Sequence, residues 1–157
     1  MLKLVIMKNK LGLRVFDMIN IHATLVKIMD KGVLLIGKSG VGKSDVALRL
    51  IMDKNALLVA DDRVNIKVCN DGLIGSSPNE IKGKLEIRNI GIVEIEYAKN
   101  AKIDLCVELV NDRNKLERMP LPKYEEILGV SIPKIELYPF DCSTIHKIIQ
   151  KISGKII

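Results

Sequence analysis

The chain has 157 residues, 48% of them apolar, which suits one domain with a substantial hydrophobic core. This composition excludes an intrinsically disordered chain and a small scaffold that depends on disulfides. The net charge of +6 comes mostly from scattered lysines, and three tyrosines, two phenylalanines and no tryptophan offer few rings for base stacking. We therefore expect no nucleic-acid partner.

The first half of the chain predicts strands and one helix around a glycine-rich turn. Residues 21–28 alternate imperfectly between apolar and polar, and the apolar run 33–37 after a turn completes a predicted β-hairpin. From Ser44 onward, apolar residues recur at helical intervals. The apolar run 56–60 then predicts a short buried strand that ends at Asp61.

The second half predicts mostly strands. Residues 64–69 and 72–76 flank an Asn-Asp-Gly turn and predict a second hairpin, and residues 83–97 and 103–110 are further strand-rich segments. A short helix is predicted before residues 130–139, whose prolines favour an edge strand or an extended segment.

A final helix is predicted after a candidate cap at Ser143, because isoleucines recur at helical intervals to Ile152. His146 lies in this helix and is expected at the surface. The cysteines Cys69, Cys106 and Cys142 form no C-x-x-C pair, so we expect reduced thiols and neither a zinc site nor a disulfide framework.

These segments predict one strand-rich α/β domain over residues 1–157. No apolar run approaches the ~20 residues of a membrane span, and no small-residue cleavage site follows the N-terminal stretch. We therefore expect a cytoplasmic protein without membrane attachment.

Residues 37–44, GKSGVGKS, match the phosphate-binding pattern G-x-x-x-x-G-K-[ST] in full. The glycines let backbone N–H groups converge on phosphate oxygens, and the following helix adds the positive end of its dipole. A glycine-rich turn that only joins a strand to a helix is the alternative, which the flanking strand and helix disfavour. The predicted nucleotide-binding residues are Gly37, Lys38, Ser39, Gly40, Val41, Gly42, Lys43 and Ser44.

In this pattern Lys43 reaches the β- and γ-phosphates of ATP, and the Ser44 hydroxyl ligates Mg²⁺. One helix later come Asp61 and Asp62, of which one can hold the metal and the other can accept a proton from an attacking hydroxyl. Their side chains converge only if the strand ends there, and a solvated acidic turn is the alternative. The short separation is typical of small kinases and predicts phosphoryl transfer to a hydroxyl.

Five stretches resemble the HPr kinase/phosphorylase family in sequence and in order: IHATLV, GVLLIGKSGVGKSDVALRLI, LVADDRV, LIGSSP and LEIRNIGIVEI. The resemblance covers roughly residues 20–120, and LEIRNIGI is close to the family's characteristic L-E-I-R-G-L-G-I. It implies a P-loop kinase core related to phosphoenolpyruvate carboxykinase. It also implies ATP- and magnesium-dependent phosphorylation of a serine on HPr, a small phosphocarrier of the sugar phosphotransferase system. Many members also catalyse phosphorolysis, and members commonly form hexamers.

The resemblance assigns roles to further residues. His22 matches an active-site histidine near the acidic pair, and Asp61 and Asp62 match the family's carboxylates, one of them the base toward serine. Glu86 matches an acidic residue associated with the metal site, which together with Ser44 and Asp61 gives the expected metal ligands. Arg88 and Arg118 are further active-site candidates. Without the resemblance, His22 is a strand-end hydrogen-bonding residue, and Glu86 with Arg88 is an ion pair on one strand face.

The chain also departs from the family pattern. Longer members carry an additional N-terminal domain, which is not expected here because about twenty residues precede the matching region. The C-terminal part resembles the compact, single-domain form, and Lys38 stands where many members have aspartate. Two other functions stay open on the residues alone: a kinase for a small metabolite, and a nucleotide-binding regulatory module without transfer activity.

Overall fold

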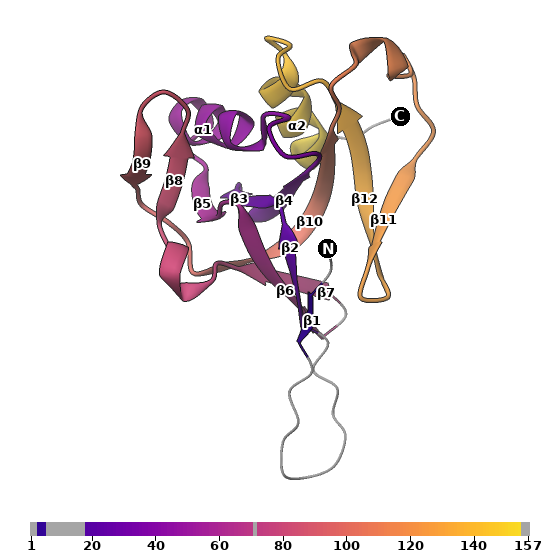
Figure 1. The fold of residues 1–157 in the computed structure, drawn as a ribbon. Coiled ribbons are helices and arrows are strands. Elements are labelled where there is room, and N and C mark those ends of the chain that lie inside the picture. Colours follow the sequence, from indigo (N-terminus) through magenta and orange to yellow (C-terminus); the bar gives the residue numbers. More distant parts are fainter. Residues whose placement is uncertain (1–2, 6–17, 71, 155–157) are drawn as a thin grey trace.

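The computed structural model describes residues 3–5, 18–70 and 72–154. Within this part, the chain forms a ten-stranded mixed sheet, a separate two-stranded sheet and two α-helices (Figure 1). The prediction of one strand-rich α/β domain is confirmed. Of the helices described, none has the length and apolar character that crossing a membrane would require.

The elements follow one another in the order that Figure 1 labels. The strands are β1 (Lys3–Val5), β2 (Met18–His22), β3 (Thr24–Ile28), β4 (Lys31–Ile36), β5 (Leu57–Ala60), β6 (Arg63–Cys69), β7 (Gly72–Ser76), β8 (Lys84–Ile87), β9 (Gly91–Glu94), β10 (Asn100–Leu109), β11 (Lys123–Ile127) and β12 (Val130–Leu137). The helices are α1 (Lys43–Lys54) and α2 (Thr144–Ser153), and single 3-10 turns cover Asn79–Ile81 and Arg113–Lys115.

The long strand β10 joins the two halves of the large sheet. Its first residues pair antiparallel with β7, which continues the order β7, β6, β2, β1. Its later residues pair in parallel with β4 on one side and β12 on the other. The register with β4 shifts between Ile103 and Leu105, a local irregularity of the kind that bends a strand.

Two hydrophobic clusters fill the two faces of this sheet. Val33 and Leu35 of β4 pack with Val46 and Leu50 of α1 and with Ile148 of α2, in the cluster between the sheet and the helices. Leu34, which points to the opposite face, belongs to the second cluster, between the two halves of the sheet. Because β4 is buried on both faces, its sequence is almost continuously apolar.

Helix α1 begins and ends at residues in the left-handed region of backbone conformation. Gly42, which precedes the helix, has φ 118°, and Asn55, which follows it, has φ 55° and donates its N–H to the carbonyl of Leu50. Val46, Ala47 and Leu50 form its buried face, as the helical spacing predicted.

The predicted strand at 21–28 is in fact two strands. Residues up to His22 form β2 and pair with β6, whereas residues from Thr24 form β3 and pair with β4 and β5. The buried Ala23 is the point where the chain passes from one half of the sheet to the other. The predicted hairpin with residues 33–37 is confirmed for β3 and β4.

The helix predicted before residues 130–139 is wrong. The residues just before them form β11, which pairs antiparallel with β12. Cross-strand ion pairs join Lys123 to Glu136 (2.7 Å) and Lys134 to Glu125 (2.9 Å). Residues 130–139 were predicted to be an edge strand or an extended segment. β12 is not an edge strand over its full length, because it lies between β10 and β11, but its residues up to Pro133 pair with β11 alone. Pro133 is tolerated because the pairing with β10 begins only after it.

The remaining predicted elements are confirmed. β6 and β7 form a hairpin with Asn70 at φ 53°, whereas Asp71 of the predicted turn lies outside the described residues. β8 and β9 form a second hairpin, and α2 begins after Ser143, although the Ser143 side chain makes no capping hydrogen bond.

The three cysteines are free thiols in the structure. Cys106 is buried in β10, and burial raises the pKa of its thiol to about 12, so it is unreactive in the folded protein. Cys69 and Cys142 are exposed.

Candidate active site

A pocket of about 540 Å³ lies where the glycine-rich loop, the ends of β2 and β5, and the β8–β9 hairpin meet. It brings together most of the residues that the sequence proposed for the site. Its lining includes His22, Thr24, Ser39, Gly40, Gly42, Lys43, Ser44, Asp45, Leu48, Asp61, Asp62, Glu86, Ile87, Arg88, Asn89 and Phe140.

The loop between β4 and α1 is held by its own backbone and by the core below it. The N–H of Val41 donates to the carbonyl of Lys38 (3.1 Å), and the Val41 side chain is buried in the cluster under the helices. A β-carbon on Gly37, at φ 146°, would lie 2.7 Å from the carbonyl oxygen of Leu109, so the loop can pass β10 this closely only with glycine there. These contacts fix the loop so that Ser39 and Gly40 face the pocket.

Lys43 ties the two ends of the loop together. Its Nζ donates to the carbonyl oxygens of Gly37 (2.9 Å) and Lys38 (3.0 Å). An ammonium group has three donors, so one remains for a phosphate oxygen in the pocket. Burial lowers the pKa of Lys43, and the nearby charges of Asp61 and Asp62 act in the opposite direction. A bound phosphate would further favour the charged form of Lys43.

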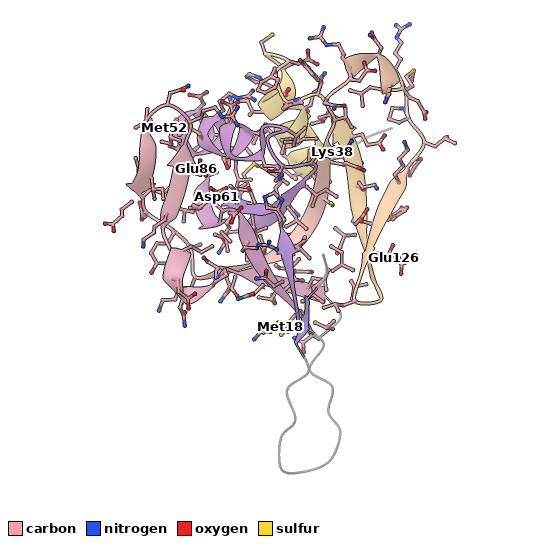
Figure 2. All side chains as sticks on the ribbon, in the orientation of Figure 1. Met18, Lys38, Met52, Asp61, Glu86 and Glu126 are labelled. Carbon is pink, nitrogen blue, oxygen red and sulfur yellow. The ribbon has the colours of Figure 1, made fainter. Side chains whose placement is uncertain are left out.

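Asp61 is buried at the base of the pocket, where three donors hold its carboxylate. Only 5% of the residue is exposed. Oδ1 accepts hydrogen bonds from Thr24 Oγ1 (2.9 Å) and Ser44 Oγ (2.8 Å), and Oδ2 accepts one from the backbone N–H of Glu86 (3.3 Å). The β8–β9 hairpin therefore reaches the acidic pair through its backbone (Figure 2).

Asp62 also faces the pocket, because β5 ends at Ala60 and the two aspartates form the turn into β6. Asp62 has φ 68°, and the N–H of Arg63 donates to the carbonyl of Asp61 (2.8 Å). This tight turn removes the alternation that would point adjacent strand residues to opposite faces. The sequence predicted that the two carboxylates converge only if the strand ends at this point. The strand does end here, and both aspartates line the pocket.

His22 pairs with Asp62. The two strands β2 and β6 are antiparallel with His22 opposite Arg63, which places the imidazole beside the acidic turn. His22 Nε2 lies 3.2 Å from Asp62 Oδ1, and 70% of the Asp62 side chain is exposed. Among the described residues, Asp62 thus has His22 as the partner of its carboxylate, and it is open to the pocket, unlike the enclosed Asp61.

The oxygen atoms of Ser44 and Asp61 fit a magnesium ion. Mg²⁺ prefers oxygen ligands, and proteins often hold it through one or two side chains while water and substrate phosphates complete the shell. Ser44 Oγ and Asp61 Oδ1 are neighbours in the pocket, and Glu86 lines the same wall. In residues 3–5, 18–70 and 72–154, no group of three or more His, Cys, Asp or Glu side chains is arranged to hold a metal by itself.

Proteins of similar sequence and structure place this site in a family. The family model described as the HPr serine kinase C-terminal domain matches residues 14–155. The chain belongs to this family. The match extends further in both directions than the stretch of roughly 20–120 that the sequence motifs covered.

Two curated members of the HPr kinase/phosphorylase family show the extent of the similarity. The chain is 39% identical to the HPr kinase/phosphorylase of Caldicellulosiruptor bescii over 125 residues, which is 73% of this chain and 40% of that protein. It is 40% identical to the HPr kinase/phosphorylase of Thermoanaerobacter sp. (strain X514) over 140 residues, 82% of this chain and 46% of that protein. The chain thus spans less than half the length of these relatives.

A solved member of the family has the same fold. The structure of the Hpr(Ser) kinase/phosphatase from Coxiella burnetii superposes with a TM-score of 0.72 at 31% identity, covering 86% of this chain and 99% of that one. The expectation of an HPr kinase-like α/β fold is therefore confirmed.

Some residues predicted from the phosphate-binding pattern or from the HPr kinase/phosphorylase resemblance lie outside the pocket. Arg118 is exposed and does not line it. Lys38 is exposed. Gly37 and Lys38 accept hydrogen bonds from Lys43 through their carbonyls, Val41 holds the loop through its N–H and its buried side chain, and none of the three lines the cavity. His146 is exposed on α2, as predicted.

Six residues that line the pocket were not among the predicted site residues: Thr24, Asp45, Leu48, Ile87, Asn89 and Phe140. Thr24, in the IHATLV stretch, is 1% exposed, and its hydroxyl donates to Asp61. The signal in the sequence was a polar hydroxyl residue at the start of a mostly apolar strand. Phe140 reaches the pocket from the segment before α2, and no local pattern connects it to the loop. Glu86 and Arg88 both line the pocket, and no ion pair joins them within the described part of the chain.

Proposed function

We propose that this chain is an ATP- and magnesium-dependent kinase domain that phosphorylates a serine of HPr or a related phosphocarrier in the cytoplasm. The observation that supports the proposal most is one pocket with a complete phosphate-binding loop on one side and Asp61 and Asp62 on the other. Relatives named HPr kinase/phosphorylase and the solved Hpr(Ser) kinase/phosphatase support the choice of substrate.

The loop and α1 would bind the triphosphate of ATP. Backbone N–H groups of residues 39–44 and the N-terminal end of the α1 dipole favour anions at this point. Lys43 supplies a full positive charge at the same place, and the glycine at 40 leaves open space, since a β-carbon there would meet nothing within 4 Å. The β- and γ-phosphates would therefore lie next to the acidic pair.

Ser44 and Asp61 would hold the magnesium ion, with Glu86 on the same wall. When bound, the ion neutralises charge on the β- and γ-phosphates during transfer. Asp61 is suited to this role because its carboxylate is buried, fixed by Thr24 and next to the Ser44 hydroxyl.

Asp62 would accept the proton of the incoming serine. Its carboxylate is exposed to the pocket, and His22 holds it in position at 3.2 Å. As the proton moves to Asp62, the serine oxygen bonds to the γ-phosphorus and the bond from that phosphorus to the β,γ-bridging oxygen breaks. Phosphoserine and ADP are formed, and Lys43 and Arg88 can offset negative charge on the transferred group.

The reverse reaction would use the same groups. A protonated Asp62 returns its proton to the serine oxygen while inorganic phosphate takes the phosphoryl group, which yields pyrophosphate and free serine. Homo-oligomeric assembly, common in the family, is likewise a proposal for this chain.

Transfer to HPr is the experiment that tests the function. We expect the purified protein, incubated with ATP, Mg²⁺ and HPr, to add one phosphate to a serine, measured by mass spectrometry of the HPr peptides. HPr with that serine replaced by alanine is the control. Phosphorylation of a small hydroxyl metabolite but not HPr would select a metabolite kinase. ATP binding without any transfer would leave only a nucleotide-binding module.

A further inference from the structure

Phe140 is a part of the pocket wall that the proposed chemistry does not use. It follows β12, it lines the pocket, and 59% of the residue is exposed. Its ring covers the end of the phosphate-binding loop, because a β-carbon on Gly42 would lie 3.2 Å from Phe140 Cζ. The ring of Phe140 therefore combines two features: it is accessible from solvent, and it lies beside the phosphate-binding loop at the wall of a polar pocket.

The segment that carries Phe140 is firmly attached to the protein. The guanidinium of Arg49, on α1, donates to the carbonyl oxygen of Pro139, and Thr144 Oγ1 donates to the carbonyl of Tyr138 (2.6 Å). The rings of Tyr138 and Phe140 meet edge to face, with centroids 5.7 Å apart and an angle of 81° between their planes. The Phe140 ring is thereby held in place before any ligand arrives, which limits the entropy lost on binding.

The part of this segment between Phe140 and α2 is anchored as well. Asp141 forms ion pairs with Arg113 and with Lys147 (3.8 Å), and the guanidinium of Arg113 lies 5.3 Å from the centre of the Tyr138 ring. In Figure 1 this segment, in yellow, lies above the start of α1, whereas β5, which leads to Asp61, lies below α1. The segment between β12 and α2 and the strand that leads to Asp61 therefore approach the phosphate-binding loop from different sides.

We propose that Phe140 is the stacking platform for the base of the bound nucleotide. The inference rests on the proposed function, in which the γ-phosphate lies at Asp61 and Asp62. The other end of the nucleotide must then leave the loop away from the acidic pair, toward the segment between β12 and α2, whose Phe140 ring reaches the loop at Gly42. Its ring offers a π-face to the base.

Stacking on a single ring does not select one base, because every base has a π-face. Phe140 should therefore strengthen the binding of ATP and GTP alike, and it should add nothing to the binding of the phosphates alone. From the usual effect of removing one stacked aromatic, we expect ATP affinity to fall roughly 5- to 150-fold in Phe140→Ala.

The test compares Mg·ATP with Mg·tripolyphosphate, a ligand without base or ribose, by titration calorimetry on the full chain. In Phe140→Ala the affinity for ATP should fall at least fivefold, whereas that for tripolyphosphate should change less than about twofold. Phe140→Tyr should restore ATP binding, and Phe140→Leu, which keeps apolar bulk without a ring, should not.

Three results would overturn the inference. An equal loss of affinity for ATP and tripolyphosphate would mean that Phe140 supports the loop. Unchanged ATP affinity would place the base elsewhere. A raised KM for HPr at unchanged ATP affinity would mean that Phe140 contacts the protein substrate. Because binding is measured without transfer, Phe140-dependent ATP binding in a protein that does not phosphorylate HPr would uphold the inference and refute the proposed reaction. A parent protein that binds neither ligand would refute both.

Discussion

The substitution Asp62→Asn is expected to lower the rate of phosphoryl transfer to HPr by about 100- to 10,000-fold, the usual contribution of a general base. Asparagine keeps the size of the side chain and an oxygen that His22 can contact, but it cannot take the serine proton. The affinity for Mg·ATP should change little, because the proposed mechanism places Asp62 on the side of the incoming serine. Single-turnover transfer and calorimetric ATP binding measure the two quantities separately.

Asp61→Asn is the matched control for this prediction. It replaces the buried neighbour, whose carboxylate contacts the Ser44 hydroxyl, so it should reduce the effect of Mg²⁺ on ATP affinity as well as the transfer rate. If Asp62→Asn impaired magnesium-dependent binding and Asp61→Asn impaired only transfer, the two roles would be exchanged. If both variants transferred at the parent rate, neither carboxylate would be part of the mechanism.

The second large effect is expected for Lys43→Met, which removes the ammonium group and keeps a similar apolar stem in its buried position. Loss of one charged donor aimed at the transferring phosphate typically lowers the rate about 100- to 1,000-fold. ATP affinity should fall too, because Lys43 also bonds the loop carbonyls of Gly37 and Lys38. Transfer rate and ATP affinity, each with a thermal unfolding scan to confirm folding, are the measurements.

Lys38→Met is the control for Lys43→Met. It removes the same charge from the same loop, but the Lys38 side chain is exposed and does not line the pocket. We expect its transfer rate to stay within about threefold of the parent, as for most surface substitutions. Equal losses in the two variants would show that general positive charge, and not the position of the Lys43 ammonium, supports the phosphates.

The parts of the site that the sequence predicted well are those that depend on neighbouring residues. Glycine spacing in 37–44 defines the loop, one helix follows, and the next buried strand ends at Asp61. Each of these three features depends only on residues that are close in sequence. The tight turn at Asp62 then directs both aspartates to the pocket.

The parts that the sequence predicted less directly depend on contacts between distant segments. His22 reaches Asp62 only through the pairing of β2 with β6, and Glu86 reaches Asp61 through the docking of the β8–β9 hairpin. The motif resemblance pointed to both residues, but it gave no reason for their positions. Arg118, a further active-site candidate from the resemblance, does not line the pocket.

The errors in the predicted fold have the same cause. Alternation in residues 21–28 indicated one strand, but Ala23 is where the chain moves between two halves of the sheet. Residues 123–127 were predicted as a helix, and pairing with β12 through the ion pairs of Lys123 and Lys134 makes them a strand. In both places tertiary pairing overrides the local pattern.

A crystal structure with Mg²⁺ and a non-hydrolysable ATP analogue is the most direct test of the claim that one pocket positions both phosphate and acceptor. The proposed arrangement requires the triphosphate along residues 37–44, its terminal phosphate between Lys43 and Asp62, and the cation beside Ser44 and Asp61. A nucleotide bound outside this loop, or a terminal phosphate turned away from both aspartates, would contradict it.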